Sequence, residues 1–269
     1  MGVSYSQLQT YRRCPKQYEF MTVKKIPRRI TPGESFGSGI HNALQRWGNQ
    51  EILTASPAPA LPLTLFTDDT PPEKLRPLEL TTLLTFWREC FIAEAGLGRT
   101  EMDANLARGD LLLRQFFDWW NCKARTVAAI ETGFKLTVPP TPEHQGRPLV
   151  LTGRFDRIER TPAGLHIIDY KTGGTRPQKD VDEDLQLSIY ALAAADQFQE
   201  TVAELTLLFL GEDGLVERTT TRNDDQLKGA LTAIRKLGDG ITNADFHADP
   251  QTEKCRWCPY REICPESAA

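Results

Sequence analysis

Residues 149–171 read LVLTGRFDRIERTPAGLHIIDYK, and this stretch decides the fold. Two apolar runs flank a turn sequence at 162–164, which predicts two antiparallel strands joined by a short connection. The second run ends in an acid and a base two positions apart, so strand alternation places Asp169 and Lys171 on one face. The first run carries Asp156, which the pairing would bring beside Asp169.

Two carboxylates at neighbouring strand positions repel each other and are costly to desolvate. A divalent cation such as Mg2+ resolves this conflict, because hard ions prefer carboxylate and backbone carbonyl oxygens. The carbonyl oxygen of Tyr170 is a third candidate ligand, and Lys171 would stabilise the charge growing on a phosphoryl oxygen. Taken alone, an Asp-x-Lys pair is better explained as a plain ion pair that closes the strand. The second acid, Asp156, is what favours a metal site.

The segment upstream of this stretch also alternates in polarity. From residue 127 the pattern has a period of two, and it predicts a strand with one apolar face at Ile130, Thr132, Phe134, Leu136 and Val138. Glu131 is then expected on the opposite face. It is either an exposed strand residue or a third carboxylate of the site.

Helical patterns surround these strands. At the N-terminus, Ser4 and Gln7 form a capping-box signature, and Cys14 precedes Pro15 at the expected junction of two short helices. A further helix is expected over 36–50, with His41 beside its apolar stripe. Downstream, the pattern predicts helices over 181–197 and 224–237 and strands near 205–210 and 215–220. Mixed strands with helices between them indicate an α/β fold with a mixed central sheet flanked by helices.

An inserted region separates the N-terminal helices from the strands. Residues 54–77 carry six prolines, which is typical of a loop. Residues 78–95 and 105–124 show apolar spacing of three and four, so two helices are expected there, with aromatic side chains that serve the core. We therefore expect N-terminal helices over 1–50, a loop and helical insert over 51–126, an α/β core over 127–240 and a C-terminal cysteine segment over 241–269.

The overall composition is that of an ordinary globular protein. The chain has 269 residues, 40% of them hydrophobic and 25% charged, with a net charge of -4. No membrane span or secretory signal is visible, which predicts a cytoplasmic protein without a membrane partner. Between residues 12 and 29, however, seven basic residues face a single acid. Such a stretch is either a solvated face or a phosphate-binding surface, with five candidate DNA contacts: Arg12, Arg13, Lys16, Lys24 and Lys25.

The six cysteines are too few for a disulfide scaffold in a chain of this length. Cys255, Cys258 and Cys264 follow the spacing C-x2-C-x5-C, and Cys14 stands near the other end of the chain. This arrangement favours metal ligation. Cys90 and Cys122 have no assigned role, although Cys122 falls in the helical insert and is expected to be buried there.

Together these motifs resemble the RecB-like exonucleases of the PD-(D/E)XK nuclease superfamily. The likeness extends along most of the chain and follows the family's order. It is carried by SYSQLQTYRRCP at 4–15, GIH at 39–41, Glu131, GRFD at 153–156, DYKTG at 169–173, QLSIY at 186–190 and the terminal cysteines. The resemblance implies a restriction-endonuclease-like core.

The resemblance also implies roles for individual residues. His41, Glu131, Asp156 and Asp169, with the carbonyl of Tyr170, would hold Mg2+ or Mn2+, and Lys171 would be the catalytic lysine. Gln186 and Tyr190 are four apart and share a helical face, and in the family they help to position the DNA and the lysine. The catalytic set is therefore Glu131, Asp156, Asp169, Lys171, Gln186 and Tyr190.

One branch of the family, which includes the AddB subunit and CRISPR-associated nucleases, holds a [4Fe-4S] cluster with one cysteine before the core and three after it. By this resemblance Cys14, Cys255, Cys258 and Cys264 would form an iron-sulfur clamp joining the two ends of the chain. Structural Zn2+ is the alternative, although most such sites use two paired C-x2-C clusters.

The function expected from the resemblance is a metal-dependent DNA exonuclease. It would act on single-stranded DNA or DNA ends in repair, recombination or CRISPR adaptation, with protein partners from CRISPR adaptation or repair. The alternative is an adaptor subunit that binds DNA ends without cutting them.

Overall fold

The computed structural model describes residues 2–55, 75–91, 98–140 and 148–269. Its centre is a six-stranded mixed sheet in the order β1-β3-β4-β5-β6, with β2 paired to β3 as well. The β1–β3 and β4–β5 pairs are parallel and the others antiparallel. The strands are β1 (Gly2–Ser4), β2 (Val127–Val138), β3 (Leu149–Thr161), β4 (Gly164–Lys171), β5 (Val202–Gly211) and β6 (Gly214–Thr220).

The predicted antiparallel pairing of the two central strands is confirmed, with Ile158 opposite Ile167. Gly164 begins β4 with φ 132°, a backbone conformation that favours glycine. A Cβ atom there would also lie 2.4 Å from the carbonyl oxygen of Thr201. β1, by contrast, is a strand that the sequence analysis did not predict.

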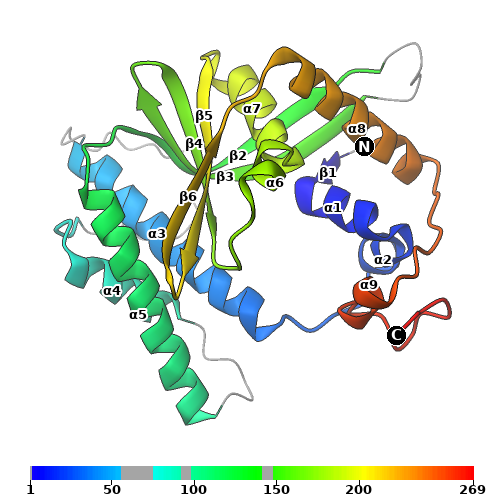
Figure 1. Ribbon diagram of the computed structural model, residues 1–269, viewed down its shortest axis with the longest axis horizontal. Helices are drawn as coiled ribbons and strands as arrows, with labels where there is room; N and C mark the ends of the chain where they lie inside the picture. The colour runs from blue at the N-terminus through cyan, green and yellow to red at the C-terminus, as the bar shows by residue number, and fades with distance from the viewer. Residues whose placement is uncertain (1, 56–74, 92–97, 141–147) are drawn as a thin grey trace, which may run out of the picture.

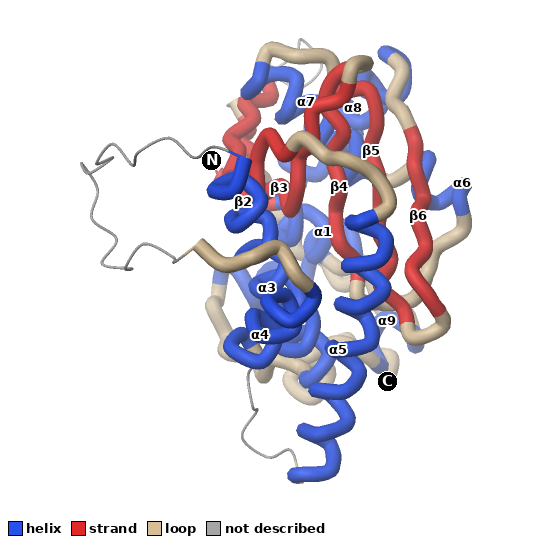
Figure 2. Tube along the Cα trace, turned by 90° about the vertical axis from the view of Figure 1, so that its left-hand side faces the viewer, coloured by secondary structure: helices blue, strands red, loops and turns tan. Residues whose placement is uncertain are grey.

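Helices cover both faces of the sheet (Figure 1). On one face, α1 (Tyr5–Arg13), α7 (Leu185–Phe198) and α8 (Asp224–Thr242) bury the larger apolar cluster. On the other, α3 (Pro32–Ala55), α4 (Leu80–Cys90) and α5 (Arg99–Asn121) pack against alternate residues of β4 and β5. Figure 2 looks onto these last helices, which lie in front of the strands. The fold is an α/β architecture consistent with a restriction-endonuclease-like core.

Several helix boundaries differ from the predicted ones, for local reasons. α3 begins at Pro32, earlier than predicted, because proline suits the first turn of a helix. The predicted helix over 181–197 is instead two helices, α6 (Gln178–Asp182) and α7. Asp184 causes the break, since its carboxylate accepts the backbone N–H of Leu187 and caps α7.

The helical insert is part of the second core, as its aromatic pattern predicted. Leu112 and Phe116 of α5 are fully buried, and Phe116 packs edge-on against Tyr170 of β4. Most of the predicted proline-rich loop lies outside the described residues. Within the described parts of the chain, no helix is both long and apolar enough to cross a membrane.

The N-terminal helices lie beside the C-terminal segment of the chain (Figure 1). The predicted capping box of Ser4 and Gln7 is present and starts α1, and α2 (Pro15–Tyr18) and η1 (Glu19–Val23) follow. The Tyr11 hydroxyl donates to the carbonyl of Asp245 at 2.7 Å, and Arg13 donates to the carbonyl of Lys254 at 3.0 Å. Lys254 belongs to α9 (Thr252–Arg256), so both contacts join the N-terminal helices to the C-terminal segment.

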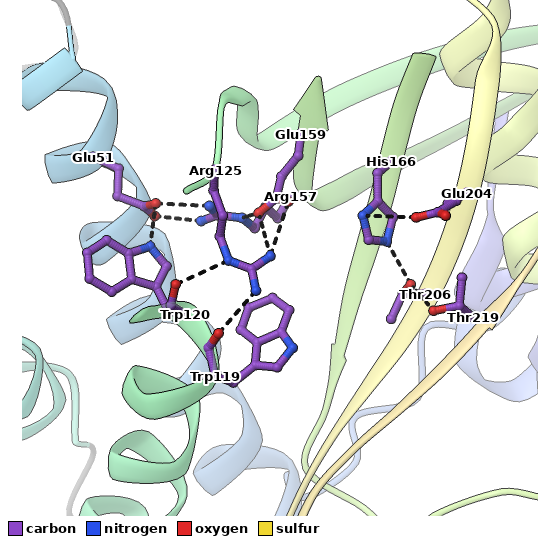
Figure 3. Close-up of polar contacts among 10 residues, drawn as sticks. All are labelled: Glu51, Trp119, Trp120, Arg125, Arg157, Glu159, His166, Glu204, Thr206 and Thr219. Carbon is purple, nitrogen blue, oxygen red and sulfur yellow. Dashed lines mark hydrogen bonds and ion pairs between the residues drawn. The ribbon is translucent and has the colours of Figure 1, made fainter. Parts of the chain in front are cut away.

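Beneath α3 and α5 the sheet carries buried charges (Figure 3). Arg157 is fully buried and donates to both carboxylate oxygens of Glu51, at 2.5 and 2.9 Å. It also donates to Glu159 at 2.7 Å, and Arg125 donates to the same carboxylate at 3.2 Å. Two arginines thus neutralise two buried glutamates that come from α3 and β3.

His166, the buried histidine of β4 in Figure 3, predicts a pH dependence of stability. Its ring contacts the Thr206 hydroxyl at 2.7 Å. Burial lowers its pKa below the usual 6.5. The charge of Lys123 lowers the pKa further, whereas the charges of Glu159, Glu204 and Glu217 raise it by less than burial lowers it. The folded state therefore resists protonation, and this contribution to stability is lost as the pH falls below 6.5.

We expect the free energy of unfolding to fall more steeply between pH 7 and pH 5 in the wild type than in His166→Gln. Urea denaturation at several pH values measures both slopes. Equal slopes would contradict the assignment.

Candidate active site

The candidate site lies where β3 changes partner. On one side β3 pairs with β2 along its length, but on the other it pairs with β1 at residues 150–152 and with β4 at residues 157–161. Residues 153–156 have no partner on that side within the described sheet. At the end of this fork the carboxylate of Asp156 accepts the backbone N–H of Tyr170 at 2.7 Å. Asp156 is thereby fixed beside the end of β4.

Glu131 of β2 lies between Ile130 and Thr132, whose partners on β3 are Arg157 and Phe155. It has a left-handed backbone conformation, with φ 45°. This conformation breaks the predicted alternation. A Cβ on Gly48 of α3 would collide with Ile130, whereas Phe134 belongs to the cluster on the other face. The prediction that Ile130 and Phe134 share a face was therefore wrong. The irregular backbone turns Ile130 and Glu131 both toward α3, and strained backbone of this kind is common at functional sites.

α3 supplies His41 to the same place. His41 Nδ1 lies 3.4 Å from Asp156 Oδ2 and 4.0 Å from Glu131 Oε1. One ligand atom from each of the three residues lies within 4.8 Å of the other two, which is close enough for one metal ion. All three line an open pocket of 610 Å3 whose wall includes Arg28 and Thr172.

The electrostatics of this pocket favour a cation. Burial and the charge of Asp156 raise the pKa of Glu131 to about 7. Burial also opposes the charged form of His41, but its contact with Asp156 outweighs this and raises the pKa of the ring. A divalent ion would offset the repulsion between these acids, which the raised pKa of Glu131 reflects.

A second group of side chains surrounds Asp169. Lys171 Nζ lies 2.6 Å from Asp169 Oδ2, as the predicted common strand face requires. Gln186 of α7 donates to Asp169 Oδ1 at 3.0 Å and accepts from Lys171 Nζ at 2.9 Å. The Tyr190 hydroxyl lies 3.1 Å from Asp169 Oδ1 and 2.9 Å from the carbonyl oxygen of Arg154.

These contacts hold Asp169 with the lysine, so it is not one of the three clustered ligand residues. The charges still interact: burial raises the pKa of Asp169, Lys171 opposes this and Asp156 adds to it. Tyr170 contributes its backbone N–H to Asp156, while its side chain is buried in the second core. A direct role for Asp169 and for the Tyr170 carbonyl as metal ligands remains a prediction.

Comparison with known proteins identifies this arrangement. The family model described as the PD-(D/E)XK nuclease superfamily matches residues 2–265. The chain belongs to that superfamily. The chain is 24% identical to the Gene 69 protein of Mycobacterium phage D29, and the alignment covers 97% of this chain and 96% of the relative. It is 22% identical to the Gene 69 protein of Mycobacterium phage L5, over 97% and 95% of the two chains.

Among solved structures, the chain described as the crystal structure of SSO0001 aligns with 85% of this superfamily member and 86% of its own length. The identity is 14% and the TM-score 0.40.

The basic residues between positions 12 and 29 differ in their contacts. Arg13 binds the carbonyl of Lys254, and Lys16 and Lys24 each lie 3.0 Å from Glu19. Arg12 is exposed and lines a hollow of 480 Å3 with residues of α8. Lys25 is exposed. Arg13 therefore has a contact that joins the N-terminal helices to the C-terminal segment, and DNA binding by all five basic residues stays a prediction.

The four cysteines predicted to act together do lie together. Cys14, Cys255, Cys258 and Cys264 all line one small cavity between the N-terminal helices and the C-terminal segment. Cys122 lies apart in α5's C-cap and is exposed, so the expectation that it is buried was wrong. Its thiol instead donates to the carbonyl of Asp118, one helical turn earlier.

Sequence reasoning did not single out Arg154. Its guanidinium lies 3.5 Å from Glu131, although it belongs to the same GRFD motif that supplied Asp156. The signal was available in the spacing, because residues two apart on a strand face the same side.

Proposed function

We propose that this protein is a metal-dependent DNA exonuclease. The observation that carries the proposal is the convergence of His41, Glu131 and Asp156 in one open pocket. The Asp169–Lys171 pair stands at the end of the neighbouring strand. Membership in a nuclease superfamily supports the same reaction class.

The donor set fits a divalent ion. One imidazole nitrogen and carboxylate oxygens from two acids suit Mg2+ or Mn2+, with Mn2+ the more tolerant of nitrogen. His41, Glu131 and Asp156 would hold the ion, with Asp169 as a further carboxylate nearby. When bound, such an ion offsets the repulsion between the acids and polarises a phosphoryl oxygen.

The remaining steps belong to the chain's own side chains. Lys171 presents its ammonium group to the phosphate and stabilises the charge that develops during attack by water. Gln186 keeps this lysine in place, because it bonds Lys171 and Asp169 at once. Tyr190 ties the same carboxylate to the backbone of β3.

The segment 24–34 is a candidate path for DNA to the pocket, because it is largely exposed and part of it lines the pocket. Arg28 and Ile30 of this segment line the pocket and are exposed. Glu34 holds the Arg28 guanidinium at 2.8 and 2.9 Å. Lys24 and Lys25 precede it, so cations lead from the chain ends to the acidic site, and affinity for DNA should fall with salt.

Cleavage assays test the proposal directly. Purified protein is incubated with single-stranded, duplex and flap DNA labelled at either end, in Mg2+, Mn2+ or EDTA. We expect release of short products in the presence of metal, and none from Asp169→Ala. An adaptor that binds DNA ends would instead leave all substrates intact, and equal cleavage by wild type and Asp169→Ala would reject this site.

We further propose that the four cysteines hold a [4Fe-4S] cluster. All four are described and line one cavity between the N-terminal helices and the C-terminal segment. One cysteine combined with a C-x2-C-x5-C group differs from the two paired C-x2-C clusters of most structural zinc sites. The cluster's role would be structural, since about 240 residues separate Cys14 from Cys255 and closing so long a loop stabilises the fold.

The clamp makes a visible prediction. Protein purified without oxygen should be brown, and Cys258→Ser should be colourless and melt at a lower temperature. Cys122→Ser is the matched control and should keep both the colour and the melting temperature, because Cys122 is exposed and outside the cavity. A colourless wild type with one zinc per chain would overturn the cluster.

A further inference from the structure

Arg154 occupies an unusual position at the acidic site. Its side chain is 61% exposed, and its guanidinium lies 3.5 Å from Glu131 Oε2. The other oxygen of the same carboxylate, Oε1, faces His41. Glu131 therefore stands between the Arg154 guanidinium and the His41 ring, with Oε2 turned to the first and Oε1 to the second.

The strand fixes the side on which Arg154 lies. A Cβ on Gly153 would collide with Phe134, and Phe155 packs against the same ring with centroids 4.8 Å apart. Gly153 and Phe155 thus face the larger cluster, so alternation places Arg154 and Asp156 on the opposite side. The Tyr190 hydroxyl holds the carbonyl oxygen of Arg154 from the cluster side.

The guanidinium is not committed to the fold. Arg157, three positions along β3, is fully buried and donates hydrogen bonds to Glu51 and Glu159. Within the described residues, the Arg154 side chain makes one ion pair, at 3.5 Å to Glu131, and is itself 61% exposed. Solvent screens a guanidinium this exposed, so the pair contributes little to stability. Its charge is instead available at the mouth of a site that would receive a phosphodiester.

From these contacts we propose that Arg154 is a phosphate-contacting residue of the site. This inference rests on the proposed function and extends it. Arginine presents five N–H donors in a planar fork that matches phosphate oxygens. With one edge turned to Glu131, the fork offers its other edge to a DNA phosphate adjacent to the one that is cut. Glu131 would thereby contact both the metal ion and the arginine that binds the substrate.

The test is DNA binding by Arg154→Gln in EDTA, where no metal supports cleavage. A fluorescein-labelled single-stranded oligodeoxynucleotide is titrated at several salt concentrations, and its anisotropy gives Kd. We expect Kd to rise about three- to tenfold. The slope of log affinity against log salt should lose about 0.7, the value of one phosphate contact on a single strand.

Arg160→Gln is the matched control. Arg160 lies on the same strand, is 51% exposed and pairs with Glu200 at 2.9 Å. It lies in the part of β3 that pairs with β4, beyond the unpaired residues 153–156. We expect this variant to bind DNA like the wild type. Both variants should keep the wild-type urea midpoint.

Mn2+ titration by calorimetry separates contact with DNA from orientation of Glu131. If Arg154 contacts phosphate, Arg154→Gln should bind Mn2+ as well as or better than the wild type, because a competing cation is gone. Weaker Mn2+ binding together with unchanged DNA affinity would overturn the inference. A wild type that binds DNA but does not cut it would defeat the proposed nuclease while leaving this contact measurable. A wild type that binds no DNA would defeat both.

Discussion

Replacing Lys171 by methionine is expected to lower kcat for DNA cleavage about 10²- to 10³-fold, the typical loss on removing one preorganised group that stabilises developing charge. The ammonium group lies between Asp169 and Gln186, and methionine keeps most of the lysine's length without its charge. KM should change little, because a single group facing the reacting phosphate acts mainly in the transition state. Single-turnover cleavage of end-labelled DNA in Mg2+ measures the effect.

The control for this variant is Lys179→Met, which removes an exposed lysine of α6 outside the site. It should cleave at the wild-type rate. Lys171→Met should also keep the stabilisation by Mn2+ in thermal melts, since His41, Glu131 and Asp156 are untouched. Cleavage by Lys171→Met within fivefold of the wild type would remove the lysine from the mechanism.

Replacing Arg157 by leucine should lower the free energy of unfolding by about 3–5 kcal/mol, the usual cost of removing one partner from a buried ion pair. Leucine fits an apolar surrounding, but it leaves the carboxylates of Glu51 and Glu159 with too few partners (Figure 3). Arg125 can neutralise one of them. Urea denaturation gives the size of the loss.

Two further variants isolate the cause. Arg160→Leu on the same strand breaks a solvent-exposed pair and should cost less than about 1 kcal/mol. The double variant Glu51→Leu, Arg157→Leu should recover part of the loss, because the remaining Arg125 and Glu159 still pair. If the double variant were less stable than Arg157→Leu by the full cost of a second deletion, burial of unpaired charge would not be the reason.

Local patterns were enough to predict most of the framework. The pairing of β3 with β4, the common face of Asp169 and Lys171 and the Ser4 capping box are all present, because each depends on a few neighbouring residues. The alternation argument failed at Glu131, since it assumes regular backbone and the φ there is left-handed. The break at Asp184 was missed because a capping side chain competed with an otherwise continuous helical pattern.

The site itself shows the same division. Strand spacing was enough to nominate Asp156 and Lys171, and the resemblance to the RecB-like exonucleases nominated His41. They could not say which of these meet. Asp169 turns to Lys171, Gln186 and Tyr190, while His41 joins Glu131 and Asp156.

Spacing along the chain determines which residues share a strand face or a helix face, since the periods of 2 and 3.6 are properties of the local backbone. The amino-acid sequence alone therefore determined the α/β framework and the chemical groups of this protein. Which acids lie within reach of one ion depends on the fork between β1 and β4, on the turned backbone of Glu131 and on the seating of α3. Those are set by packing between distant segments, and only the tertiary structure decided them.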